Sequence, residues 1–184
     1  KTNHRIVDAA ALAIYSPAGI IVHTGDFKVD YTPVFGDAID LQRFAEIGKK
    51  GVLGLMCDST NAERPGFTPS ERTVGKTFDI LFQEHKNTRI IIATFASNVD
   101  RVQQIINTAY KFGRKVVVEG RSMVNVIETA TNLGYLSIPD NTLIDIEQLK
   151  NYPDEKTVII TTGSQGESMA ALSRMAEDNH RKIS

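Results

Sequence analysis

The sequence lacks the features that mark secreted, membrane-bound or cysteine-rich proteins. Its 184 residues include one cysteine, Cys57. A single cysteine can form neither an internal disulfide nor a cysteine-based zinc cluster, which favours a reducing compartment such as the cytoplasm. There is no run of about 18 apolar residues, and residues 1–4 lack the basic start and apolar stretch of a signal peptide. We therefore expect a cytoplasmic protein with no membrane span.

The chain also lacks an excess of charge of either sign. Its 21 basic and 22 acidic residues give a formal net charge of -1, so no positive field of the whole protein attracts nucleic acid. Any affinity for nucleic acid must come from a local cluster of Arg and Lys. The composition, 41% apolar and 23% charged, is that of an ordinary globular protein and excludes a disordered or fibrous chain.

The first third of the chain predicts strands around one helix. Apolar runs on both sides of a Pro/Gly turn predict a β-hairpin over residues 9–26. Residues 40–48 are typical of a helix that Asp40 caps and Gly48 ends. An apolar strand is expected at residues 51–57.

Two acids of this region, Asp26 and Asp58, each follow an apolar strand. A carboxylate at the end of such a strand is partly desolvated, so it tends to be paired, hydrogen-bonded or metal-bound. The alternative is that both are ordinary surface acids, and it stays open. Cys57, inside the predicted strand, is expected to be a small buried hydrophobe.

A cluster of turn formers at residues 61–69 marks a domain boundary, which we place between residues 66 and 67. A capped amphipathic helix begins at Ser70. Strands and helices then alternate regularly, which predicts an α/β domain with a mostly parallel sheet flanked by helices. The expected strands are residues 89–94, 115–118 and 157–162, with a shorter β segment at 142–146. The expected helices are residues 97–112, 122–133 and about 166–176.

Ligands of open parallel sheets gather where strand-to-helix loops converge, because helix N-termini there offer free N–H groups to anions. The loops after the three main strands carry hydroxyls, amides and a guanidinium, which suit a phosphate. The alternative is that these residues only cap helices or form tight turns. The candidate residues are Ser97, Asn98, Arg121, Ser122, Ser164 and Gln165.

The four histidines show no close metal-ligand spacing such as two histidines one helical turn apart. His85 lies in a polar helix end and His180 in a charged tail, so we expect neither to carry function. Spacing alone therefore predicts no metal site.

Six segments in order resemble the ribonuclease J family, in the β-CASP branch of the metallo-β-lactamase superfamily. They are Thr-Asn-His at 2–4, His-Thr-Gly-Asp-Phe-Lys at 23–28, Asp-Ser-Thr-Asn-Ala-Glu-Arg-Pro-Gly at 58–66, Ala-Thr-Phe-Ala-Ser-Asn at 93–98, Gly-Arg-Ser-Met at 120–123 and Thr-Thr-Gly-Ser-Gln-Gly-Glu at 161–167. The resemblance covers essentially the whole chain.

The resemblance implies a partial metallo-β-lactamase domain at residues 1–66, followed by a β-CASP domain at 67–184. It implies a zinc-dependent ribonuclease that processes and degrades RNA as a 5′-to-3′ exonuclease and endonuclease, with two zinc ions, and that forms a homo-oligomer, either a dimer or a tetramer. By position, His4 matches a metal-binding histidine, Asp26 an aspartate that bridges both metals, and Asp58 the acidic β-CASP motif. The resemblance thus implies that Asp26 and Asp58 are catalytic residues and that His4 and Asp26 bind metal. The six candidate loop residues fall in the lid that faces the RNA in the family.

The sequence also departs from the family pattern. Arg-Ile-Val-Asp follows His4 where the family usually has Ser-Ile-Pro-Asp, and no His-x-His-x-Asp-His motif is present. A hydrolytic zinc ion takes about three protein ligands plus water, and His4 and Asp26 cannot supply that number. We expect this chain to be an internal piece of the enzyme, with other ligands before Lys1 and after Ser184, and to be inactive and weak in zinc binding by itself.

Two other functions remain as alternatives. The first is a non-catalytic RNA-binding or scaffolding paralogue that assembles with an active ribonuclease; the retained Asp26 argues against it. The second is a nucleotide-binding α/β domain that uses residues 163–166. That reading lacks support, since neither a Gly-x-Gly-x-x-Gly pattern nor a P-loop lysine is present.

Overall fold

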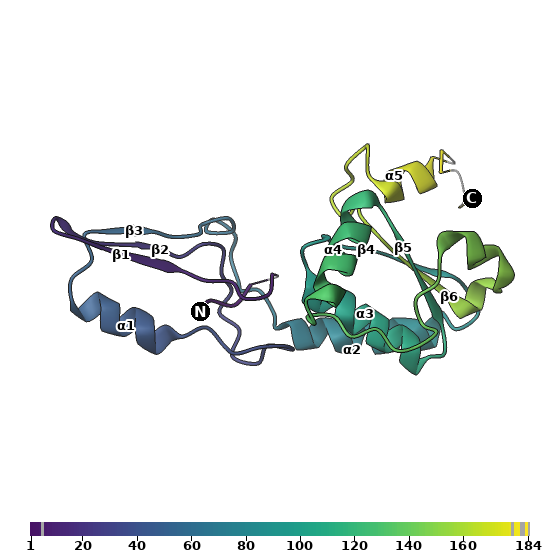
Figure 1. Cartoon of the computed structure of the whole chain (residues 1–184), viewed down its shortest axis with the longest axis horizontal. Helices are drawn as coiled ribbons and strands as arrows, with labels where there is room; N and C mark the ends of the chain where they lie inside the picture. The colour runs from purple at the N-terminus through teal and green to yellow at the C-terminus, as the bar shows by residue number, and fades with distance from the viewer. Residues whose placement is uncertain (5, 178, 181–182, 184) are drawn as a thin grey trace. The chain divides into compact units, whose positions relative to one another are not determined.

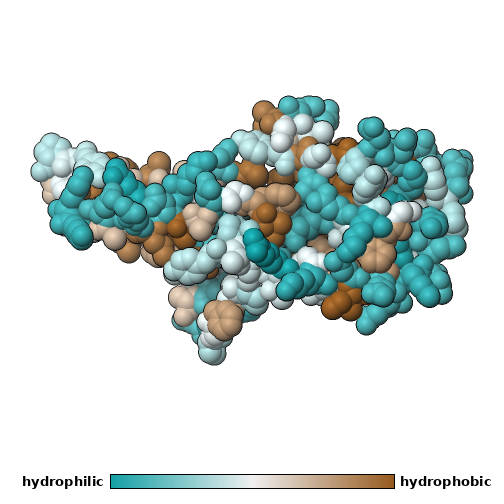
Figure 2. Space-filling view, turned by 90° about the horizontal axis from the view of Figure 1, so that it is seen from below, coloured by the Kyte–Doolittle hydropathy of each residue, from teal (hydrophilic) through white to brown (hydrophobic). Residues whose placement is uncertain are grey.

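The structure is a computed structural model that describes residues 1–4, 6–177, 179–180 and 183. The chain divides into two compact units, Lys1–Thr73 and Val74–Ser184. Each unit contains its own three-stranded sheet (Figure 1). Hydrophobic residues reach the surface of both units (Figure 2).

The first unit is built on the predicted hairpin. Strands β1 (Leu12–Ser16) and β2 (Gly19–His23) pair antiparallel, so this prediction is confirmed. Helix α1 (Leu41–Lys49) follows, and β3 (Gly54–Met56) then pairs parallel to β2. Strand β3 is shorter than the predicted run of residues 51–57, because the chain reaches the sheet only at Leu53, whose N–H donates to the carbonyl of Ile20.

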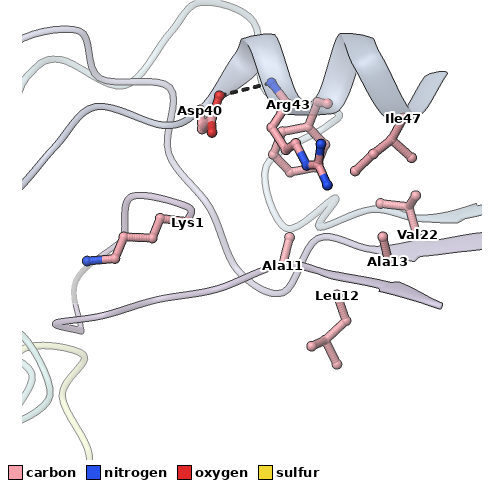
Figure 3. Close-up of a pocket in the computed structure, with 9 residues that line it drawn as sticks. Lys1, Ala11, Leu12, Ala13, Val22, Asp40, Arg43 and Ile47 are labelled. Atoms are coloured by element: carbon pink, nitrogen blue, oxygen red, sulfur yellow. Dashed lines mark hydrogen bonds between the residues drawn. The ribbon is translucent and has the colours of Figure 1, made fainter. Parts of the chain in front are cut away.

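Helix α1 covers one face of this sheet. The carboxylate of Asp40 caps the helix and accepts a hydrogen bond from the N–H of Arg43 at 2.9 Å. Ile47 of the helix and Val22 of β2 are both buried and line the same small hollow (Figure 3). Leu12 points to the other side of the strands in this view. The covered face is thus the core of the first unit.

The second unit has the predicted α/β fold. Helix α2 (Glu71–Glu84) begins in the first unit and continues into the second. The elements that follow are β4 (Ile90–Ala93), α3 (Val99–Lys111), β5 (Lys115–Glu119), α4 (Arg121–Asn132), β6 (Thr157–Thr161) and α5 (Ala171–Ala176). The three strands pair in parallel in the order β4-β6-β5.

Helical segments cover both faces of the second sheet. Val117 and Ile159 lie side by side on one face and cluster with residues of α5 and of the 3-10 helix η1 (Ile146–Asn151). Val118 points to the other face, where it lines a hollow together with Ile127 of α4. All five residues of the central strand β6 are buried as a result.

Three local predictions are wrong. Residues 142–146 form no strand: Leu143 makes a single bridge to Val116, and Asp145 then caps η1, which the 3-10 helix η2 (Asp154–Lys156) follows. The helix expected from about residue 166 begins at Ala171, because turns occupy the residues before it. Cys57 is exposed rather than buried, since it follows the end of β3.

No helix within the described part of the chain is long and apolar enough to cross a membrane.

Candidate active site

The parallel pairing of β2 and β3 brings two acidic loops to one edge of the first sheet. His23 at the end of β2 lies beside Met56 at the end of β3. Asp26 follows the first of these ends and Asp58 the second. The N-terminal segment joins the same edge, because the N–H of Lys28 donates to the carbonyl of Asn3 at 2.6 Å. His4, Asp26 and Asp58 are therefore all carried by segments that meet at this edge.

A tight turn fixes the backbone before Asp26. Gly25 adopts a φ of +60°, a left-handed conformation that favours glycine. Its N–H donates to Nδ1 of His23 at 3.0 Å. A Cβ at this position would lie 3.3 Å from the carbonyl oxygen of Ala10. The turn leaves the side chain of Asp26 exposed to solvent.

Asp58 is half-buried, and donors around it keep its carboxylate charged. The hydroxyl of Thr60 donates to Asp58 Oδ1 at 2.6 Å and the N–H of Thr60 at 3.0 Å. These two hydrogen bonds hold the pKa of Asp58 below its ordinary value, and the N–H of Phe27 and the nearby His4 act in the same direction.

Two of these side chains offer metal-ligand chemistry. His4 carries an imidazole and Asp26 a carboxylate, both of which bind zinc in proteins. No group of three or more His, Cys, Asp or Glu side chains that could hold a metal ion is present among the described residues.

The second unit presents three loops at the carboxyl edge of its parallel sheet. The N–H of Thr94, after β4, donates to the carbonyl of Thr161 at the end of β6 at 3.0 Å. Gly120, after β5, lies so close to the β6 loop that a Cβ there would meet Oγ1 of Thr162 at 2.9 Å. The loops after β4 and β5 thus both touch the end of β6. Five of the six candidate residues are exposed: Ser97, Arg121, Ser122, Ser164 and Gln165.

Asn98 is the exception, because it is buried at 1% exposure and caps helix α3. Its Oδ1 accepts from the N–H of Arg101 at 3.2 Å. A capping role is therefore confirmed for Asn98, although its buried Nδ2 has no hydrogen-bond partner. The phosphate-binding role predicted for Asn98 would use this amide group as the donor.

Helix α4 begins without a side-chain cap. Its N-cap is Gly120, with φ +103°, which has no side chain that could accept a hydrogen bond from the first turn. Arg121 and Ser122, both exposed, are the first two residues of the helix. Uncapped N–H groups beside a guanidinium form a suitable setting for an anion.

In the loop after β6, Glu167 accepts hydrogen bonds from two other residues. The N–H of Gln165 donates to the carboxylate of Glu167 at 3.1 Å, and the hydroxyl of Ser173 donates to the carbonyl of Glu167 at 2.7 Å. An anion that bound to the N–H of Gln165 would have to displace that carboxylate.

Two contacts in the structure were not predicted from the sequence. Thr60 fixes Asp58, and the spacing Asp-x-Thr, typical of a turn in which the carboxylate accepts from the residue two ahead, could have revealed it. His180, assigned no function, lies with its Nε2 3.2 Å from Oε1 of Glu119, just before the α4 loop. No local pattern connects two residues so distant in sequence.

Comparison with known proteins identifies relatives for both units. Residues 87–184 match the family model described as "Ribonuclease J, beta-CASP domain". Over 100% of its length the chain is 48% identical to a ribonuclease J of Synechocystis sp., and over 98% it is 50% identical to that of Helicobacter pylori strain J99. It is also 45% identical, over its whole length, to ribonuclease J2 of Bacillus subtilis. The chain covers 28%, 26% and 33% of the lengths of these three proteins.

A solved structure shares the fold. It is a protein of unknown function from Enterococcus faecalis V583, which matches 90% of this chain and 41% of its own with a TM-score of 0.59. The sequence identity is 20%, so this likeness concerns the fold alone.

Proposed function

The chain belongs to the ribonuclease J family, and from this premise we propose that it carries part of the active site of a metal-dependent ribonuclease. The observation that supports the proposal most directly is the edge of the first sheet, where parallel strands bring the loops of Asp26 and Asp58 together beside the segment of His4. The proposed substrate is RNA.

In the proposed site, His4 and Asp26 are metal ligands and Asp58 is a supporting acid. The imidazole and carboxylate match the ligands that zinc accepts, and the two zinc ions of the intact enzyme would need further ligands from outside these residues. When bound, zinc neutralises charge on the oxygens of the phosphodiester that is cut. Asp58 remains ionised through its bonds to Thr60 and places negative charge beside His4.

The loops of the second unit would hold the RNA backbone. Arg121 is exposed at the uncapped start of α4, where its guanidinium can fork onto a phosphate. The exposed hydroxyls and amide of Ser97, Ser122, Ser164 and Gln165 would add neutral donors. For Asn98 we propose a part in the same RNA-binding loop: Oδ1 caps α3, and Nδ2, which is buried here, would reach RNA only after a movement of the loop.

The expected cleavage mode, cellular location and assembly follow from membership of the ribonuclease J family. We propose that the intact protein cuts RNA both from the 5′ end and internally, works in the cytoplasm in RNA processing and decay, and assembles as a dimer or tetramer. A single exposed thiol at Cys57 agrees with a reducing compartment.

Replacement of Asp26 tests the function. In the intact protein that contains this sequence, Asp26→Ala should abolish RNA cleavage, because a proposed metal ligand would be lost, while the exposed position should leave thermal unfolding nearly unchanged. Cleavage of a 5′-monophosphorylated RNA is the measurement, with Asp37→Ala as an exposed control that should stay active. Normal turnover by Asp26→Ala would contradict the proposal and favour the scaffolding alternative.

The 184-residue chain by itself should show no nuclease activity and at most weak zinc binding, because two ligands do not complete a zinc site. Titration calorimetry with zinc measures this directly. Tight uptake in a fixed ratio would show that the chain holds a complete site.

A further inference from the structure

A buried threonine connects the two acidic loops. Thr24 lies just after β2 and is 5% exposed. Its Oγ1 accepts a hydrogen bond from the N–H of Asp58 at 3.1 Å and donates to the carbonyl of Gly25 at 2.7 Å. Its backbone N–H donates to the carbonyl of Met56 at 3.0 Å. One residue therefore bonds to the peptide units next to both acids.

The hydroxyl of Thr24 joins the two acidic loops at the backbone, whereas the N–H of Phe27 joins them through the carboxylate of Asp58. The strand pairing of β2 with β3 ends at His23 and Met56, and the backbone bond of Thr24 extends it by one step. Beyond that step the hydroxyl connects the two loops: it accepts from the N–H of Asp58 and donates to the carbonyl of Gly25, and Oγ1 also lies 3.5 Å from the carbonyl oxygen of Met56. A hydroxyl has both capacities, whereas an alkyl group of the same shape has neither.

We propose that Thr24 is a positioning residue of the ribonuclease site, which sets the spacing between the loops of Asp26 and Asp58. The proposal rests on the function proposed above. Thr24 acts through the backbone: it fixes the N–H of Asp58 and the carbonyl of Gly25, the residue before Asp26. Its own side chain is buried and need not touch RNA or metal.

Loss of the hydroxyl should slow the reaction more than it weakens RNA binding. Without the bridge, the N–H of Asp58 would be buried without its partner, so the loop would move to satisfy it. A displacement of about 1 Å at a reacting centre can cost about 100-fold in rate. Because the proposed RNA contacts lie mainly in the second unit, KM should change little while kcat falls.

The test compares substitutions in the intact protein. Thr24→Val keeps the shape and removes the hydroxyl, and we expect kcat for RNA cleavage to fall by roughly 10- to 100-fold with KM within about threefold. Thr24→Ser keeps the hydroxyl and should restore kcat to within about threefold of the original. Thr108→Val is the matched control: it also removes a hydroxyl from a buried threonine, but that hydroxyl donates only within α3, to the carbonyl of Gln104.

A second measurement does not depend on activity. Hydrogen-deuterium exchange at the amide of Asp58 should be faster in Thr24→Val than in the original protein or in Thr24→Ser, because the acceptor of that N–H is gone. If Thr24→Val does not fold, Thr24→Ala and Thr24→Ser, which differ by the hydroxyl alone, replace it. Equal kcat for the variants with and without the hydroxyl, or equal exchange at Asp58, would overturn the inference.

The outcomes also separate this inference from the proposed function. An inactive Asp26→Ala together with a fully active Thr24→Val would remove only the role of Thr24. An active Asp26→Ala would remove the ribonuclease function of this site and the role of Thr24 with it.

Discussion

Asp58 shows how a residue at a strand end can be held in one charge state. Two donors from Thr60 reach the same carboxylate oxygen, and the pKa of Asp58 is lowered as a consequence. The charged form is favoured in the folded state, so Asp58 stabilises the fold at pH values above its unfolded pKa of about 3.9. That contribution is lost as the pH falls through the lower, folded pKa.

Replacement of Thr60 should therefore raise the pKa of Asp58. Thr60→Val removes the hydroxyl donor, and the carboxyl should titrate closer to its ordinary value, while Thr60→Ser should leave the pKa almost where it is. Carboxyl ¹³C NMR of the Asp58 side chain during a pH titration measures both. An unchanged pKa in Thr60→Val would show that the hydroxyl is not the main cause.

Single residues differ in how far the sequence could predict them. Asp26 and Asp58 could be placed at strand ends because apolar runs directly precede them. The contact between Thr24 and Asp58 could not, since it joins residues 34 apart and depends on the register of β2 against β3. Among the six loop candidates, the cap at Asn98 was foreseen as an alternative, but the missing cap at Gly120 needed the backbone conformation.

At the scale of elements, the start of α2 depends on one buried acid of the first unit. Asp30 is 5% exposed, and its carboxylate accepts from the N–H groups of Thr32 at 3.0 Å and Glu71 at 3.2 Å. Burial by itself raises the pKa of Asp30, but these bonds, the hydroxyl of Ser70 and the charge of Lys28 outweigh it, so the pKa is lowered. Asp30 thus caps the first turn of α2 with a charged group.

Asp30→Asn should lower thermal stability in a pH-dependent manner. A group with a lowered folded pKa stabilises the fold above its unfolded pKa of about 3.9, so the difference in Tm between the original and the variant should be largest near neutral pH. The difference should narrow as the pH falls toward about 3. Melting curves followed by circular dichroism check this, and Asp37→Asn, whose side chain is exposed, should melt like the original at each pH. A difference in Tm that stays constant across the pH range would show that the charge of Asp30 is not the cause of the stabilisation.

The boundaries of elements were predictable where a single residue sets them. Asp40 marks the start of α1 because its carboxylate caps the helix. The start of α5 was missed by several residues, because left-handed glycines at 163 and 166 and the bonds of Glu167 keep the chain in turns. The β segment at 142–146 is reduced to one bridge for a local reason, since Asp145 caps η1 and the chain turns into that helix at Ile146.

At the scale of the whole molecule, the face of the first sheet opposite α1 carries exposed apolar side chains. Ile14 and Ile21 are directly opposite in the register, and Leu12 and Met56 lie on the same side. These side chains are exposed, by 61% for Leu12 and 58% for Met56. An apolar sheet face of this kind tends to bind other apolar surface.

The 184-residue chain should therefore self-associate through this face. Leu12→Lys combined with Ile14→Lys should reduce association, seen as a lower average mass in light scattering, with little change in the free energy of unfolding, because both side chains are already exposed. Val22→Lys, on the covered face at 3% exposure, is the contrasting variant and should unfold the first unit. Unchanged association in the double variant would show that the chain does not self-associate through this face.

The parallel pairing of β2 with β3 also has a consequence for the order of folding. The β1–β2 hairpin joins neighbouring segments and can close in about 1–10 μs. Strand β3 reaches its place only after the chain has passed through α1 and returned, and contacts across such long connections form slowly. The two acids therefore become neighbours at a late step of folding. During synthesis, Asp26 would therefore leave the ribosome well before the chain could form the proposed active site.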